Sequence, residues 1–156
     1  MKGKLRRVEN LGLVVVDYLQ LMQSDKKSDS RVNEVSDISR NLKIMAKDFG
    51  IPIICCAQLN RATESRTGEG GKKPTLSDLR DSGSIEQDAD IVLFLYRDEY
   101  YKDISGIQNE DPNAPNNANT AEVIVAKNRH GSVGNVKMGW IGQFTKFRTL
   151  EEDLKG

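Results

Sequence analysis

Residues 11–17 read LGLVVVD, and residues 51–57 read IPIICCA. Both are short, continuous apolar runs, which is typical of strands buried on both faces of a parallel sheet. Between them, apolar residues recur every three or four positions, as on one face of an amphipathic helix. These residues are Val32, Val35, Ile38, Leu42, Met45 and Phe49. Strand, helix and strand in this order predict a right-handed βαβ unit. We therefore expect an α/β fold in which helices flank a mostly parallel sheet.

The ends of the predicted helix carry residues that commonly start and stop one. Ser28, Asp29 or Ser30 can cap its first turn by accepting a hydrogen bond from a main-chain N–H. At the other end, Gly50 favours the left-handed conformation that closes many helices, and Pro52 cannot continue one. The helix is therefore expected to lie between these residues.

Further strands are predicted downstream. Residues 90–96, DIVLFLY, form a third continuous apolar run, and residues 120–127 alternate as a half-buried strand does. Before the third strand, residues 77–88 are expected to form helical turns with a break at Gly83. Residues 133–141 and 144–150 flank Gly142 and Gln143, which suit a two-residue type II′ turn. The chain should therefore close with an antiparallel hairpin.

The length and composition limit the class of protein. A chain of 156 residues corresponds to about one domain. Residues 98–119 are rich in Asn, Asp and Pro, so we expect a flexible insertion there. The 23 Lys and Arg residues balance 23 Asp and Glu residues, which excludes a globally basic nucleic-acid coat protein.

Metal, disulfide and membrane classes are also disfavoured. One histidine excludes a His-rich metal site, and the adjacent Cys55 and Cys56 cannot form a zinc knuckle or a disulfide framework. No run approaches the ~18 apolar residues of a membrane span, and no signal peptide opens the chain. We therefore expect a cytoplasmic protein without a membrane partner.

Polar residues at the predicted strand ends are candidates for a site, although each also has a purely structural interpretation. Asp17 can hold Mg²⁺ at the carboxyl end of a strand, or it can be a turn former. Gln58 can sense a phosphate or belong to an ordinary polar loop. Lys127 and Arg129 can reach an anion together or lie in a solvated turn.

A fourth candidate segment joins the long polar stretch to the third strand. Arg80 can meet a phosphate, and Gly83 allows the main chain to approach a ligand closely. The structural alternative is a capped helix start.

Taken together, these segments resemble the bacterial replicative helicase family of the DnaB type. The resemblance runs from about residue 12 to about residue 150. It rests on four motifs in the family's order and spacing, and residues 77–98 match it most specifically. The motifs are VVVDYLQLM (14–22), AQLNR (57–61), LRDSGSIEQDADIVLFLYRD (79–98) and AKNRHGSVG (126–134).

The resemblance implies a RecA-like motor domain of the P-loop NTPase class, assembled as a homo-hexameric ring on single-stranded DNA and using ATP and Mg²⁺. It implies that Asp17 holds Mg²⁺ through water and that Gln58 senses the γ-phosphate. Lys127 and Arg129 would reach a neighbouring subunit's ATP, with Arg129 as the arginine finger.

For DNA, the resemblance implies a backbone contact through Arg80, Asp81 and Gly83. The family usually has Glu at the position of Asp81. The carboxylate is therefore retained here, on a side chain that is one methylene shorter. The loop over residues 23–31 resembles, less specifically, another pore-facing loop of the family.

One family element is absent from the sequence. The phosphate loop G-x-x-x-x-G-K-[ST] does not occur, because residues 68–75, GEGGKKPT, have the wrong spacing and Pro74 stands where Ser or Thr is needed. The chain is therefore expected to be the C-terminal part of one RecA-like helicase domain over residues 1–156. The phosphate loop, the catalytic glutamate and the helical N-terminal domain that binds primase would precede Met1, and a helicase loader would bind parts that are not present here.

Two other functions stay open. The chain can be a non-hydrolysing DNA-binding or subunit-interaction fragment of such a helicase. It can also be a relative of RecA/RadA-type recombinases, which share the fold, although residues 80–90 argue against this.

Overall fold

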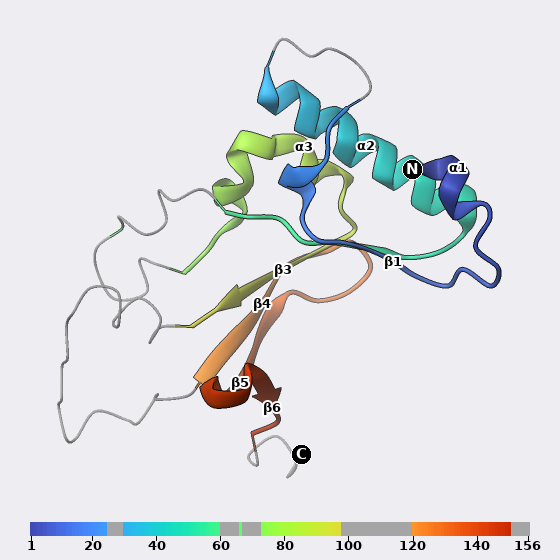
Figure 1. Cartoon of the computed structure of the whole chain (residues 1–156). Coiled ribbons are helices and arrows are strands. Elements are labelled where there is room, and N and C mark those ends of the chain that lie inside the picture. Colours follow the sequence, from blue (N-terminus) through green and yellow to red (C-terminus); the bar gives the residue numbers. More distant parts are fainter. Residues whose placement is uncertain (25–29, 60–65, 67–72, 98–119, 151–156) are drawn as a thin grey trace, which may run out of the picture. The chain divides into compact units, whose positions relative to one another are not determined.

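The computed structural model describes residues 1–24, 30–59, 66, 73–97 and 120–150 (Figure 1). The chain divides into two compact units. The first comprises residues 1–60 and 76–89, and the second comprises residues 61–75 and 90–156. The predicted insertion at 98–119 lies outside the described residues. None of the helices in the described part is long and apolar enough to cross a membrane.

The long helix of the first unit is α2, Arg31–Phe49. Of the three possible caps, Ser30 is the one used, since its hydroxyl oxygen accepts from the Asn33 N–H at 3.2 Å. Gly50 follows the helix with φ +65°, a left-handed conformation in which a side chain would be strained. The predicted helix and both of its ends are confirmed.

Two short strands flank α2 in the sequence. They are β1, Val14–Val16, and β2, Ile53–Cys55, and they pair in parallel with Val14 opposite Ile53. The predicted strand–helix–strand order with parallel strands is confirmed, although each strand is shorter than the apolar run that predicted it.

The core of the first unit lies between α2 and one face of these strands (Figure 1). Its buried residues are Leu19, Val35, Ile38, Leu42 and Met45, and Val16 and Ile53 pack against them. On the other face, Val15 is 58% exposed and Ile54 is 54% exposed. Among the described residues, helical cover is therefore found on one face of this pair and not on both.

Shorter helices complete the first unit. They are α1 (Lys2–Leu5), the 3₁₀ helices η1 (Leu19–Leu21) and η3 (Leu76–Ser82), and α3 (Gly83–Asp88). The 3₁₀ helix η3 gives way to α3 at Gly83, which confirms the predicted break. The Ser39 hydroxyl of α2 donates to an Asp88 carboxylate oxygen at 2.9 Å, so a polar contact ties α2 to α3.

The second unit contains a four-stranded antiparallel sheet in the order β3-β4-β5-β6. Its strands are β3 (Ile91–Tyr96), β4 (Thr120–Asn128), β5 (Gly134–Ile141) and β6 (Lys146–Arg148). The prediction of a mostly parallel sheet is wrong for the described strands, because only β1 and β2 pair in parallel.

The burial of β3 explains this error. Its apolar run suggests a strand covered on both faces, but Val92, Phe94 and Tyr96 are buried while Ile91, Leu93 and Leu95 are more than half exposed. Such alternation is typical of an antiparallel sheet with one packed face. Because both sets of residues are apolar, the sequence does not display the alternation.

The closing hairpin is confirmed, but its turn is not the predicted one. Ile141 pairs with Lys146, which leaves four residues in the connection. These are the 3₁₀ helix η4, Gly142–Phe144, and Thr145 at φ +50°. The rings of Trp140 and Phe147 pack edge to face across the strands with centroids 4.9 Å apart. We attribute the register, and with it the longer turn, to this aromatic pair.

Candidate functional site

Asp17 and Gln58 lie past the carboxyl ends of two paired parallel strands. Asp17 follows β1 directly, Gln58 follows β2 by three residues, and both are exposed. Because the strands are parallel, these ends meet at the same edge, where ligands bind in open α/β sheets. The structure thus brings together two of the residues that the sequence singles out.

Sequence reasoning missed Gln20, which holds the main chain of Gln58. The Gln20 side-chain nitrogen donates to the Gln58 carbonyl at 3.1 Å, and its oxygen accepts from the Gln58 N–H at 3.2 Å. The only signal in the sequence is one amide inside an otherwise apolar stretch, Leu19–Met22.

Lys127 and Arg129 lie in the second unit, and an irregularity in β4 sets their position. Val92 of β3 is opposite Lys127, whereas the adjacent Leu93 is opposite Val125. Ala126 is therefore an extra residue, a β-bulge. If residues 125–127 alternated regularly, Lys127 would share the face of Val125 and Leu93. The bulge places it on the face of Val92 instead.

Arg129 follows the end of β4 and is held twice by Asp90. Its main-chain N–H donates to the Asp90 carbonyl at 2.8 Å, and its guanidinium lies 3.1 Å from an Asp90 carboxylate oxygen. Both side chains are 45% exposed, so this ion pair contributes only about 0–1 kcal/mol.

The predicted DNA-contacting residues do not lie in a loop. Arg80 and Asp81 lie in the 3₁₀ helix η3, and Gly83 is the first residue of α3. This agrees with the helical turns predicted over residues 77–88, and Gly83 stands at a helix start, as the structural alternative describes. All three residues therefore lie within one helical turn of the point where η3 ends and α3 begins.

A family model described as the DnaB-like helicase C-terminal domain matches residues 1–149. The chain belongs to this DnaB-like family. Among its curated relatives, replicative DNA helicase DnaB of Rickettsia bellii is 47% identical over 95% of the chain and 31% of its own length. The enzyme of the same name from Haemophilus influenzae is 46% identical over 97% of the chain and 31% of its length. The chain thus spans about a third of these relatives.

Two solved structures agree with this assignment. A structure of an ATPase domain has 42% identity and a TM-score of 0.79, covering 96% of this chain and 49% of that one. A DnaB-like replicative helicase, solved in a study of its interactions with primase, has 43% identity and a TM-score of 0.81, covering 96% of this chain and 35% of that one. The predicted RecA-like α/β class is therefore confirmed at the level of the DnaB-like ATPase domain.

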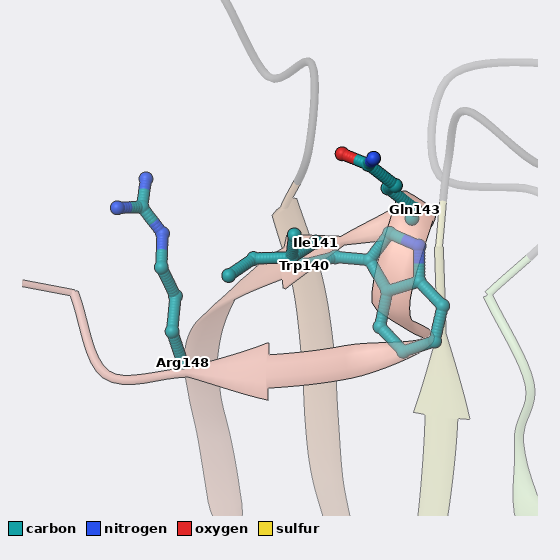
Figure 2. Close-up of a pocket in the computed structure, with 5 residues that line it drawn as sticks. Trp140, Ile141, Gln143 and Arg148 are labelled. Carbon is teal, nitrogen blue, oxygen red and sulfur yellow. The ribbon is translucent and has the colours of Figure 1, made fainter.

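In this DnaB-like chain, a shallow cavity of 290 Å³ lies at the β5–β6 turn, and none of its lining residues is a predicted site residue (Figure 2). Its lining consists of Trp140, Ile141, Gly142, Gln143 and Arg148. The Arg97 guanidinium stacks on the Trp140 ring at 4.6 Å from its centroid. In Figure 2, Arg148 extends on the opposite side of the view from the Trp140 ring.

The described residues of the DnaB-like chain contain no group of three or more His, Cys, Asp or Glu side chains that could hold a metal ion. Asp17 therefore belongs to no larger cluster of such ligands among these residues. This fits Mg²⁺, which keeps several waters and is commonly bound by one or two carboxylates together with substrate phosphates. Partial burial, with a smaller contribution from Cys56, raises the pKa of the Cys55 thiol to about 11, so this thiol stays protonated at neutral pH.

Proposed function

We propose that this chain is the C-terminal part of the motor domain of an ATP-dependent replicative DNA helicase. The complete protein would unwind duplex DNA as a homo-hexameric ring that moves on single-stranded DNA. The observation that carries this proposal is 45–47% identity to replicative helicases over at least 95% of the chain.

In this proposal Asp17 holds Mg²⁺ through water, and the edge of the β1–β2 pair receives ATP. Bound Mg²⁺ would neutralise charge on the phosphates. Gln58, at the same edge, would face the γ-phosphate and sense its presence. The shared edge of the two parallel strands supports this assignment, because it places an exposed carboxylate and an exposed amide at one end of the sheet.

Lys127 and Arg129 would act on the ATP of a neighbouring subunit. The two cations are two residues apart at the end of β4, so strand alternation would give them the same side of the β3–β4 pair. Arg129 would leave Asp90 to stabilise charge on the transferred phosphoryl group. The weakness of a half-exposed ion pair supports this exchange.

DNA would be bound through Arg80, Asp81 and Gly83 at the junction of η3 and α3, without sequence preference. Phosphate contacts position a protein on DNA but read no bases. Primase and a helicase loader are proposed partners of the complete helicase, through parts outside these 156 residues, and the cytoplasm is its proposed compartment.

The proposal is tested with a complete helicase, meaning a full-length DnaB-family protein that carries this chain at the end of its motor domain. We expect it to unwind a forked duplex with ATP and Mg²⁺. The 156-residue chain alone should hydrolyse ATP at less than about 0.1 s⁻¹, far below the typical ~10 s⁻¹, because its sequence has no phosphate loop. A complete helicase that hydrolyses ATP without unwinding DNA would reject the proposal.

The DNA role of the η3–α3 junction is tested with Arg80→Ala in the complete helicase. We expect weaker binding of single-stranded DNA for every sequence, and a log–log salt dependence flatter by roughly 0.7 for each phosphate that the protein no longer neutralises. Binding is measured at several salt concentrations. Arg40→Ala removes an exposed arginine of α2 and is the matched control. An unchanged salt slope together with a lower melting temperature would assign Arg80 a structural role instead.

A further inference from the structure

The hydrogen bonds between the two parallel strands continue past the last strand residues. The Cys56 N–H donates to the Val16 carbonyl at 2.9 Å, and the Leu19 N–H donates to the Cys56 carbonyl at 2.8 Å. At Leu19 the chain enters η1, and its extended course beside β2 ends. Gln58, two residues after Cys56, therefore lies where the next main-chain bonds of the ladder would fall.

The Gln20 side chain occupies that place. A primary amide carries a donor and an acceptor side by side, as a peptide group does. Gln20 uses both of them on one residue, since it donates to the Gln58 carbonyl and accepts from the Gln58 N–H. The position of the Gln58 main chain is thus set by a side chain of the segment that follows β1, while the Gln58 side chain remains exposed.

Arg31, at the start of α2, holds Gln20 in turn. One guanidinium nitrogen donates to the Gln20 carbonyl at 2.6 Å, and both nitrogens lie 3.3 Å from the Met22 carbonyl. These carbonyls are at the end of η1, where a helix leaves acceptors unsatisfied. The planar fork of arginine can serve both carbonyls at once, which a lysine cannot do in the same way.

The same arginine pairs with Glu34 one turn further along α2. A Glu34 carboxylate oxygen accepts from the Ser24 N–H at 2.9 Å. This main-chain hydrogen bond, followed by that from Arg31, lowers the pKa of the Glu34 carboxyl, so the acceptor stays ionised at neutral pH. A continuous series of polar contacts therefore runs from the end of β2 through Gln20 and Arg31 to the first turn of α2.

We propose that Gln20 is a positioning residue that fixes Gln58, and that Arg31 links this position to the first turn of α2. The inference deepens the proposed function, because it rests on Gln58 as the γ-phosphate sensor. A movement of the Gln58 main chain would be transmitted to α2 through two side chains, Gln20 and then Arg31. Conversely, a movement of the first turn of α2 would change how Gln58 meets the nucleotide.

Hydrogen exchange in the complete helicase tests the structural part. Gln20→Met keeps the length of the side chain and removes both hydrogen bonds. We expect the Gln58 amide to exchange about tenfold faster, the effect of losing bonds of modest net strength, with an unchanged global melting temperature. Gln20→Glu retains the acceptor for the Gln58 N–H and should give a smaller increase. Gln143→Met, at an exposed glutamine of η4, is the control.

Two results would overturn the structural part. Unchanged exchange at Gln58 in Gln20→Met would show that the amide pair does not hold this main chain. Unchanged exchange in Arg31→Gln, with Gln20→Met effective, would remove Arg31 from the link.

A double-mutant cycle, measured by the kinetics of ATP hydrolysis, tests the functional part of this inference. We expect Gln20→Met to lower the DNA-stimulated kcat about tenfold and to leave the KM for ATP within about twofold, since an ordered main chain matters most when the sensor engages the transition state. In the background of Gln58→Ala, Gln20→Met should cause no further loss. Additive losses would overturn the inference, because they would show that Gln20 acts elsewhere.

The cycle also separates this inference from the proposed function. If Gln58→Ala alone leaves the DNA-stimulated kcat unchanged, the sensor role in the proposed function fails. The exchange measurements still decide whether Gln20 and Arg31 position Gln58.

Discussion

Arg129→Ala in the complete helicase is expected to reduce ATP hydrolysis by about 10³-fold or more, because arginine fingers contribute ~10³–10⁵ in rate. The contribution arises as charge develops on the transferred phosphoryl group, so nucleotide affinity should stay within a few-fold of the original. Both quantities are measured with purified rings, kcat by phosphate release and affinity by equilibrium titration with a labelled nucleotide.

The neighbouring residue provides the control for this experiment. His130→Ala changes an exposed side chain next to Arg129 and should leave kcat nearly unchanged. The melting temperature of Arg129→Ala should also change little, since the ion pair with Asp90 is half exposed and contributes about 0–1 kcal/mol. In rings of mixed subunits, the loss should occur at the site of the neighbour. A normal kcat in Arg129→Ala would exclude this residue as the finger.

Leu19→Ala is expected to destabilise the chain by about 2–5 kcal/mol, the range for truncating a buried leucine. Leu19 is only 2% exposed and belongs to the core of the first unit. It also lies between Asp17 and Gln20, so its loss should loosen the edge that carries both. The free energy of unfolding is measured by denaturant titration of the chain.

Leu21→Ala is a matched control, because Leu21 lies in the same 3₁₀ helix and is 66% exposed. Its replacement should change the free energy of unfolding by less than about 0.5 kcal/mol, as is usual at the surface. Equal losses in the two variants would show that η1 is not anchored through Leu19.

The parts of the fold that follow local rules could be predicted from the sequence. The helix α2 is an example, since its apolar period, its cap Ser30 and its final Gly50 all lie within one segment. The strands around it could be predicted for the same reason. The placement of Asp17 and Gln58 at one edge then follows from parallel pairing alone.

The parts that depend on distant partners could not be predicted in the same way. The direction of β3 depends on its pairing with β4, and its apolar exposed face conceals the alternation that would have revealed an antiparallel sheet. Gln20 was missed for a related reason. The Gln20 amide extends the hydrogen bonding between the two parallel strands, but one side chain creates no periodic pattern in the sequence. Its partner, the Gln58 main chain, is 38 residues away and is known only from the folded structure.

The bulge at Ala126 makes β4 tolerant of a change in length at this one position. Ala126 is the extra residue, because Leu93 is opposite Val125 and Val92 is opposite Lys127. An in-frame deletion of codon 126 would join Val125 directly to Lys127. Strict alternation would then keep Lys127 on the face of Val92, opposite the same residue as before. A one-residue deletion here therefore preserves the cross-strand pairs on both sides of the bulge.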